Sequence, residues 1–575
     1  MGLPLRERRK KWLPGEQQPW AAPHTSSMPI VLSSKVDPFH CLPNGMPFRS
    51  SELLQYFSQL ENPIGHGLTN KQSQCLSLAV QSPDALRNTL LIAGLHYAWH
   101  SGQLRNYEST FFFHKVEAMR LVNGWLKSLQ PKMVAVCIRE ISTLAFTECG
   151  LGDLATAETH LDGLTRFMDL HKPVTIRNRP EIGVEDELSH RYFMLSYTFI
   201  HGVKSRLKDI IDTIDPLGTN AKLEPFEVES LMHKWHLEEI GGLETRLKAM
   251  TLFPAFFSPP PPRTVFQDID GLPIIETLRQ MTKMVVLSRR RDCVSPSGNG
   301  EPLDQVWLEG APTRMLLAFV NSHSQSMSPS GKIMMASNAS DYMMASWSGV
   351  FSATSLYLQS VLVLWNAGQP LEPRLHRRVL LILKHDLDRL DYMEESGNTA
   401  ASDFWLWRAF LGAFSLARHH KCTQEMVQTL QPYFEHLIGT WILKTGVTAW
   451  AKAKERLASI VWPDGFRHDD VAEAVWNRAV LRLTRRTLLN GRSCLTLCYL
   501  IDCYGKSWMI HRLIHIVMKA GITHDRLPEI CCLQGARKPN KADKGNTMAV
   551  DARTSADLSQ SSNIRGLVSE LEHAS

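Results

Sequence analysis

The stretch "PKMVAVCIREISTLAFTECGLGDLATAETHLDGLTRFMDLHKP", Pro131–Pro173, indicates the fold class of this chain. Its apolar residues recur at helical spacing on both sides of Gly150–Asp153, where glycine and aspartate favour a turn. Pro173 closes the second run, because proline has no amide hydrogen with which to continue a helix. We therefore predict two antiparallel helices, each with one apolar face.

The same periodicity extends over most of the 575 residues, and strand-like alternation is nearly missing. In "SPDALRNTLLIAGLHYAWHSG", Ser82 stands at the cap position, Pro83 at the first helical position, and Gly102 just beyond the end. In "FRSSELLQYF", Ser50 or Ser51 can cap a further helix. We predict an all-α fold: a large helical domain of packed antiparallel helix pairs with disordered termini and a flexible internal insertion.

Breaker residues and composition suggest the domain limits. Residues 1–36 read as a basic, disordered linker, and residues 37–480 as one helical domain. Pro259–Pro262 should lie outside any helix, and an insertion at about 294–340 should be poorly ordered, with some helix around "RMLLAFVNS". Residues 481–575 read as a divergent extension that is disordered after about 537.

The overall composition fits a globular protein that stays inside the cell. It is 44% hydrophobic and 21% charged, with a net charge of +6 and eleven cysteines, and "MGLPLRERRKKWLPGE" has charges where a secretion signal would be apolar. The uncharged segment 342–371 is interrupted by serines and is too short in its apolar part for a bilayer. We predict that it forms a buried core helix and that the protein has no membrane contact.

Four segments together resemble the regulatory domain of fungal-specific transcription factors, the zinc-cluster family. They are "VDPFHCLPNGMPFRSSELLQYF" (36–57), residues 82–102, "DFWLWRAFLGAFSLARHH" (403–420) and "GVTAWAKAKERLASIVWPDGFRHDDVAEAVW" (446–476). The resemblance rests on their order and spacing and is weak between residues 263 and 344. It implies a nuclear, non-enzymatic transcription regulator whose helical domain dimerises, or senses a small molecule or co-regulator.

The family usually binds DNA through a six-cysteine binuclear zinc cluster that precedes this domain. Residues before Asp37 contain no cysteine, so such a cluster cannot be built from them. We therefore expect no cofactor in the chain as given, and DNA contact only weakly or through a partner. A basic run is a candidate for nuclear import and consists of Arg6, Arg8, Arg9, Lys10 and Lys11.

One competing signal lies near the C-terminus: Cys494, Cys498, His511 and His515 have the C-x3-C-x12-H-x3-H spacing of a zinc finger. Asp502 stands where the finger needs a core aromatic residue, and the would-be recognition helix is apolar. An apolar helix with incidental cysteines and histidines is the favoured interpretation, and no metal site is predicted. A helical scaffold unrelated to transcription is the alternative function, because residues 151–170 look like one tetratricopeptide-type pair that does not recur.

Other chemically suggestive residues are better explained by packing, and no phosphate-binding glycine loop or nucleophile elbow is present. The interpretation as packing or helix capping applies to His96 with His100, His419 with His420, and the aromatic cluster Trp405, Trp407 and Phe410. Asp386, Asp388 and Asp391 are interpreted as the solvated face of an amphipathic helix. In the closing segment, we expect a helix begun near Thr448 and ended by Pro463, with Trp462 filling the core; its buried face should comprise Ala453, Leu457, Ile460 and Val461.

Overall fold

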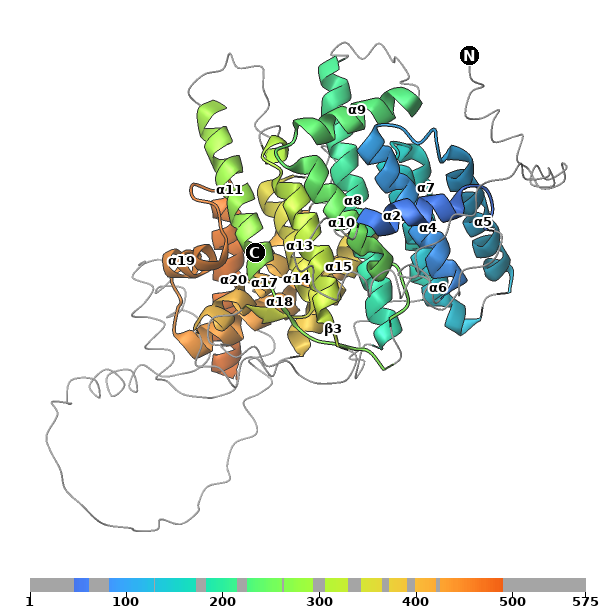
Figure 1. The fold of residues 1–575 in the computed structure, drawn as a ribbon. Coiled ribbons are helices and arrows are strands. Elements are labelled where there is room, and N and C mark those ends of the chain that lie inside the picture. The colour runs from blue at the N-terminus through green and yellow to red at the C-terminus, as the bar shows by residue number, and fades with distance from the viewer. Residues whose placement is uncertain are drawn as a thin grey trace, which may run out of the picture. The chain divides into compact units, whose positions relative to one another are not determined.

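The computed structural model describes residues 46–60, 82–128, 130–171, 183–214, 225–260, 263–292, 306–328, 343–364, 372–389, 399–419 and 424–489 (Figure 1). These residues divide into two compact units. Unit 1 contains the described residues up to Phe434 together with Arg456–Val471. Unit 2 contains Glu435–Glu455 and the described residues from Ala472. The described part is overwhelmingly helical, so the predicted all-α class is confirmed.

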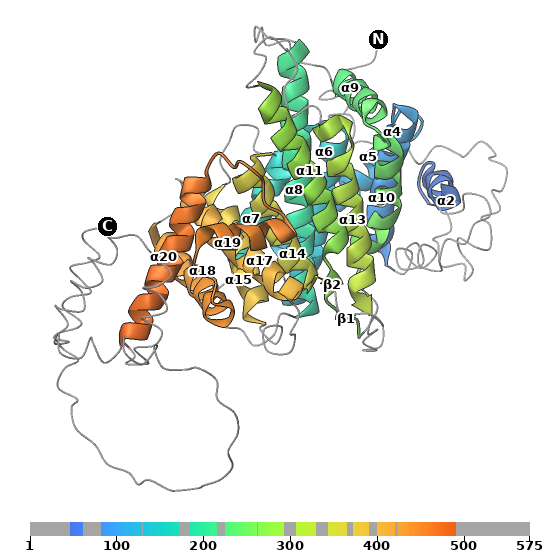
Figure 2. The ribbon, with the colours of Figure 1, turned by 90° about the vertical axis from the view of Figure 1, so that its left-hand side faces the viewer.

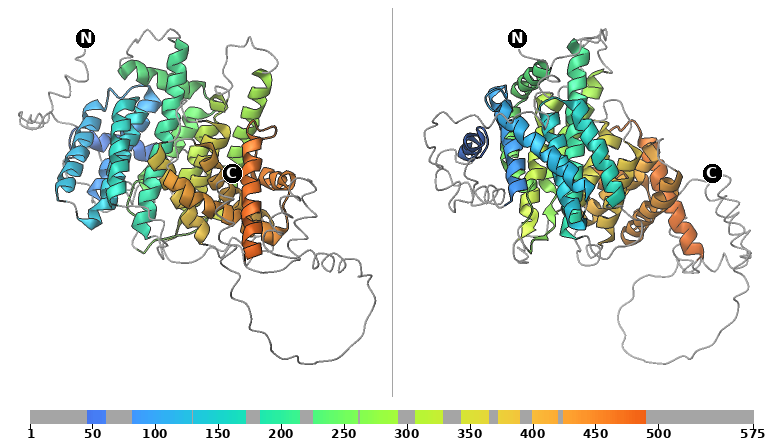
Figure 3. Two further views of the ribbon diagram at one scale, coloured as in Figure 1. Left: turned by 180° about the vertical axis from the view of Figure 1, so that it is seen from behind. Right: turned by 90° about the vertical axis from the view of Figure 1, so that its right-hand side faces the viewer.

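The described residues of unit 1 up to His171 form five α-helices, and the predicted antiparallel pair is among them. They are α2 (Ser50–Leu60), α4 (Pro83–Ser101), α5 (Glu108–Lys127), α6 (Val134–Gly150, after the 3-10 turn η2 at Pro131–Met133) and α7 (Leu154–His171). Helices α6 and α7 pack closely and also contact α8 (Val184–Ile214), as the rear view in Figure 3 shows. The turn between α6 and α7 falls at the predicted residues.

The predicted limits of α4 are confirmed, whereas the predicted cap of α2 is wrong. Helix α4 starts at Pro83 after Ser82 and ends before Gly102, which has a φ of 74° that side-chain-bearing residues rarely adopt. In α2, Ser50 is the first helical residue rather than a cap. Its hydroxyl donates to the carbonyl of Pro47 at 2.5 Å and lies 2.8 Å from Nε2 of His114, so a tertiary contact from α5 occupies it.

The middle of unit 1 contains α8 (Val184–Ile214), α9 (Pro225–Glu238), α10 (Gly242–Phe256), α11 (Leu272–Asp292) and α13 (Ala311–Ser326). Helix α13 packs against α10 and α11, and Figure 2 shows these helices side by side. Pro259 and Pro260 are outside any helix, as predicted, and Pro261 and Pro262 lie outside the described residues.

The predicted insertion at about 294–340, with Ser297–Ser337 poorly ordered, is corrected in its centre. Residues 306–328 are described, and α13 buries Met315, Phe319, Val320 and His323 on its inner face. The helix expected around "RMLLAFVNS" is confirmed as α13, whose apolar residues recur at helical spacing and pack against α10 and α11. Residues 293–305 and 329–342 lie outside the described residues.

Two short antiparallel strand pairs join residues 265–270 to residues 327–328 and 344–345. Strand β1 (Val265–Phe266) pairs with β3 (Met327–Ser328), with Val265 opposite Ser328. Strand β2 (Ile269–Asp270) pairs with β4 (Met344–Ala345), with Ile269 opposite Ala345. The chain that follows the proline-rich break is thereby hydrogen-bonded to the residues just after α13 and to those just before α14 (Trp347–Tyr357).

Unit 1 continues with α14 (Trp347–Tyr357), the π-helical turn η3 (Leu358–Leu362), α15 (Pro373–Asp388) and α17 (Thr399–Arg418). Every residue of α14 and η3 is buried, which confirms the predicted core helix in the uncharged segment. Its serines and threonines lie among neighbouring helices. Among the described residues, no helix is both long and apolar enough to cross a membrane.

The last helices are α18 (Gln424–Thr445), α19 (Trp450–Ile460) and α20 (Asp469–Leu489). In unit 2, Trp441 and Trp450 both pack against Trp476, whose indole Nε1 donates to the carbonyl of Thr448 at 2.7 Å. Helix α20 runs through Val480 without interruption, so no helix end marks the domain limit expected there.

Candidate functional site

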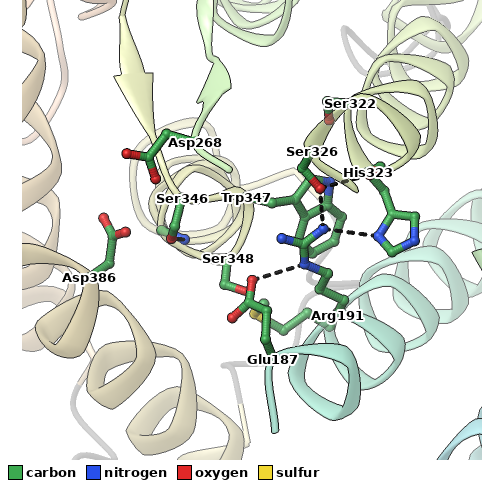
Figure 4. A network of polar contacts seen from close by, with 12 residues as sticks. Glu187, Arg191, Asp268, Ser322, His323, Ser326, Ser346, Trp347, Ser348 and Asp386 are labelled. Atoms are coloured by element: carbon green, nitrogen blue, oxygen red, sulfur yellow. Dashed lines mark hydrogen bonds and ion pairs between the residues drawn. The ribbon is translucent and has the colours of Figure 1, made fainter. Parts of the chain in front are cut away.

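A buried polar network joins three helices of unit 1 around Arg191 (Figure 4). Arg191 follows Glu187 by one turn of α8, and its Nε donates to Oε1 of Glu187 at 2.9 Å. Its Nη1 donates to Oγ of Ser326 at 2.7 Å and lies 3.0 Å from Nδ1 of His323, both on α13. Ser348 of α14 donates from its hydroxyl to the same carboxylate of Glu187 at 2.8 Å.

The network is almost completely enclosed. The side chain of Arg191 is 1% exposed, and its guanidinium lies 4.0 Å from the centre of the Phe266 ring and 5.2 Å from that of Trp347. Burial by itself raises the pKa of Glu187, but the charge of Arg191 and the hydrogen bonds from Arg191 and Ser348 more than offset this and lower the pKa below its ordinary value. The pair is therefore held in its ionised form.

The geometry of this network differs from that of a hydrolytic triad. In a triad, Nδ1 of the histidine donates to a carboxylate, whereas Nδ1 of His323 faces a donor, the guanidinium of Arg191. Burial and the charge of Arg191 lower the pKa of His323 well below its ordinary value, so the imidazole is neutral. We conclude that the network connects α8, α13 and α14 rather than activating Ser326.

Asp386 corrects a prediction, because it is buried instead of solvated. It is 8% exposed on α15 and forms an ion pair with Arg408 of α17. A side chain at Gly349 of α14 would collide with its carboxylate, so the glycine permits the close approach of α14 and α15. Asp388 does lie near the surface, where Lys384 contacts it at 2.5 Å. Asp391 is outside the described residues.

A pocket lies next to the network, between helices α8, α10, α13 and α14. Its cavity volume is about 50 Å³, several times what one water requires. Phe319 belongs both to its wall and to the surroundings of the network, because its carbonyl accepts from Nε1 of Trp347 at 2.9 Å. Its apolar lining includes Leu195, Phe199, Val203, Trp307, Met315 and Leu316.

One charged side chain, that of Arg246, reaches the pocket wall. Its Nε and Nη2 donate to Oε2 of Glu239 at 3.2 and 2.7 Å, and the hydroxyl of Thr313 donates to the other oxygen of that carboxylate. Arg246 and Glu239 are 3% and 0% exposed, and the guanidinium lies 4.6 Å from the centre of a Trp235 ring. Within the described part of the chain, Nη1 of Arg246 has no hydrogen bond.

The pocket therefore has the features of a small-molecule site. Such sites are concave and mostly apolar, with a few fixed polar groups that orient the ligand. Arg246 supplies a hydrogen-bond donor, and the carboxylate of Glu239 balances the positive charge of its guanidinium. No nucleophile paired with a base lies among the residues that line the pocket, so binding is the chemistry that this arrangement supports.

Several residues singled out in the sequence take part in packing. Tyr56 of α2 places its hydroxyl 3.0 Å from Nδ1 of His96 and 3.2 Å from Nδ1 of His100, so the two histidines join α4 to α2. Nε2 of His419 lies 3.3 Å from the hydroxyl of Ser360, and His420 is outside the described residues. The predicted aromatic core cluster is confirmed, since all three of its side chains are buried: Trp405, Trp407 and Phe410.

The remaining candidates lie outside the described residues, so the structure says nothing of them. They are the import candidate Arg6, Arg8, Arg9, Lys10 and Lys11, and the zinc-finger candidate Cys494, Cys498, His511 and His515. In the part of the chain that the structure describes, no three histidine, cysteine, aspartate or glutamate side chains are grouped as metal ligands would be.

Sequence reasoning missed both Arg191 and Arg246. A faint signal was present for Arg191, because "ELSHRYFMLSYTFIHGV" places one arginine within the most apolar run of α8. A charge in such a position needs a buried partner. The partners of Arg191 on α13 are 132 and 135 residues away in the sequence, so the local sequence pattern cannot identify them.

Comparisons with known proteins identify no relative of this chain. No protein-family model, no curated protein and no solved structure matches the chain.

Proposed function

We propose that this chain is a transcription regulator of the fungal-specific type and that its helical unit 1 is the regulatory domain. In this proposal the pocket beside Arg246 receives a small effector molecule, and the protein acts in the nucleus without catalysing a reaction. DNA contact is made weakly or through a partner, such as a second regulator or another copy of the chain.

The packing of α2 on α4 is the observation that carries the proposal. These helices come from the first two segments on which the resemblance rests, and Tyr56 and Phe57 of α2 both contact His96 of α4. The described end of the first segment thus packs on the helix formed by the second, which supports the proposal. An apolar pocket wall with one balanced charge supports the effector part of the proposal.

A tethering experiment tests the regulatory role. The chain is fused to a DNA-binding module of known specificity and expressed in a fungal host with a reporter gene that carries the module's site. We expect reporter transcription to change at least about threefold relative to the module alone. An unchanged reporter, with the fusion shown to be folded, nuclear and bound at its site, would contradict the proposal and favour the scaffold.

DNA binding by the purified 575-residue chain should be weak. Without a module that reads bases, only phosphate contacts remain, and these give dissociation constants of about 10⁻⁴ to 10⁻⁶ M with strong salt dependence. Fluorescence anisotropy with a panel of random duplexes at two salt concentrations measures this. Sequence-specific nanomolar binding would contradict the prediction and favour the zinc finger, which zinc analysis of the Cys494→Ser, Cys498→Ser variant would then test.

A further inference from the structure

We infer that the pocket between α8, α10, α13 and α14 binds an uncharged, mostly apolar molecule that carries one hydrogen-bond acceptor, such as a carbonyl oxygen, and that Nη1 of Arg246 donates to this oxygen. The inference rests on the proposed function in that it names the chemical class of the effector.

The apolar body of the ligand follows from the wall. Leu195, Phe199 and Val203 line the pocket from α8, and Met315 and Phe319 line it from α13. Burial of apolar ligand surface against such side chains supplies most of the binding free energy. Met315 has an unbranched, polarizable side chain that adapts to ligands of different shape.

The single acceptor follows from the state of Arg246. A guanidinium has five N–H donors and no acceptor, and here the N–H of Nε and one N–H of Nη2 donate to Glu239. The side chain is 3% exposed and belongs to the pocket wall, and Nη1 makes no hydrogen bond to the described residues, so both of its N–H groups are left for a ligand. A ligand with an oxygen at this position would complete the hydrogen bonding of a buried charge.

The absence of charge on the ligand follows from Glu239. Its carboxylate is fully buried and forms an ion pair with Arg246 at 2.7 Å, so the two side chains are already neutral together. A ligand carboxylate would add an unbalanced negative charge beside the buried carboxylate of Glu239, which is unfavourable. A neutral ketone avoids this repulsion and still accepts the hydrogen bond.

Three six-membered-ring probes separate these contributions. Cyclohexanone carries the acceptor, methylenecyclohexane has almost the same shape without it, and cyclohexanecarboxylate adds a charge. The methyl resonance of Met315, assigned with a Met315→Leu variant, reports occupancy in titrations of the purified full chain. We expect cyclohexanone to bind about tenfold more tightly than methylenecyclohexane, and the carboxylate to bind more weakly than the ketone.

A double variant tests the assignment to Arg246. Arg246→Met combined with Glu239→Gln removes the donor without leaving an unpaired buried charge, and the amide oxygen introduced by the second substitution can still accept from Thr313. This variant should bind the ketone and the hydrocarbon equally. The matched control, Asp386→Asn with Arg408→Met, removes a buried ion pair that is not in the pocket wall and should retain the preference. Circular dichroism confirms that both are folded.

Two results overturn the inference: binding of none of the probes, or a ketone preference that survives in the double variant. If the double variant does not fold, Thr198→Trp replaces it. Thr198 is a half-buried residue of the pocket wall. A tryptophan there should fill the pocket and abolish the shift of the Met315 methyl resonance on addition of the ketone. A shift that persists in this variant also overturns the inference. Because binding is measured on the purified chain, it is independent of the reporter outcome.

Discussion

Lowering the pH from 7.5 to 5.5 should reduce the stability of unit 1 by several kcal/mol. Burial lowers the pKa of seven of its histidines, to about 3 in His96, to about 4 in His114, His190 and His201, and well below the ordinary value in His236, His323 and His376. In the unfolded chain these histidines titrate near pH 6.5. Between the two pH values the unfolded state takes up protons that the folded state does not.

The sign of the effect follows from this difference in bound protons. Because the unfolded state binds more protons below pH 6.5, the free energy of unfolding falls as the pH falls, by about 1 kcal/mol for each such histidine at pH 5.5. Glu140 acts in the opposite direction, because burial raises its pKa to about 7. Its contribution is present at low pH and is lost as the pH rises through 7; it offsets about 1–2 kcal/mol of the loss. The histidines therefore dominate.

Urea denaturation followed by circular dichroism at several pH values measures this dependence. His114→Gln should reduce the slope of stability against pH below 6.5, because the replacement cannot take up a proton in the unfolded state. The matched control is His171→Gln, which replaces an exposed histidine instead of a buried one. A stability that is constant from pH 7.5 to 5.5 would show that the buried histidines are not neutral groups shielded from water.

Replacing Trp462 by alanine should cost about 3–5 kcal/mol of stability. The side chain is 5% exposed and lies edge-on to three phenylalanine rings, with centroid distances of 5.4 Å to Phe410, 5.6 Å to Phe414 and 5.3 Å to Phe466. The indole Nε1 has no hydrogen-bond partner among the described residues, so the loss comes from packing. The expectation that Trp462 fills the core is confirmed in its geometry.

Thermal denaturation of Trp462→Ala checks this value. Leu170→Ala is the control, because Leu170 is 76% exposed and its truncation should leave the midpoint almost unchanged. We also expect Trp462→Ala to lower solubility, since a cost of this size is a large part of the stability of a typical domain. An unchanged midpoint combined with loss of reporter activity would mean that this segment acts as a functional surface instead.

The buried face of α19 follows from the local sequence, whereas its end also depends on a tertiary contact. The predicted buried face is confirmed, since Ala453, Leu457, Ile460 and Val461 are all at most 2% exposed. The helix ends at Ile460 rather than at Pro463. Arg279 of α11 donates to the carbonyls of Ser459 and Ile460, both at 2.6 Å, and thus satisfies the last turn from 180 residues away.

The sequence by itself determined the helical class, the limits of α4, the turn between α6 and α7 and the buried face of α19. These features depend on periodicity and on proline and glycine, which act within a few residues. The tertiary structure alone decided that α13 belongs to the core, that Asp386 is buried with Arg408, and that Arg191 and Arg246 reach their partners. The physical reason is that a buried charge is stable only beside a specific partner, and the pocket exists only where four helices meet.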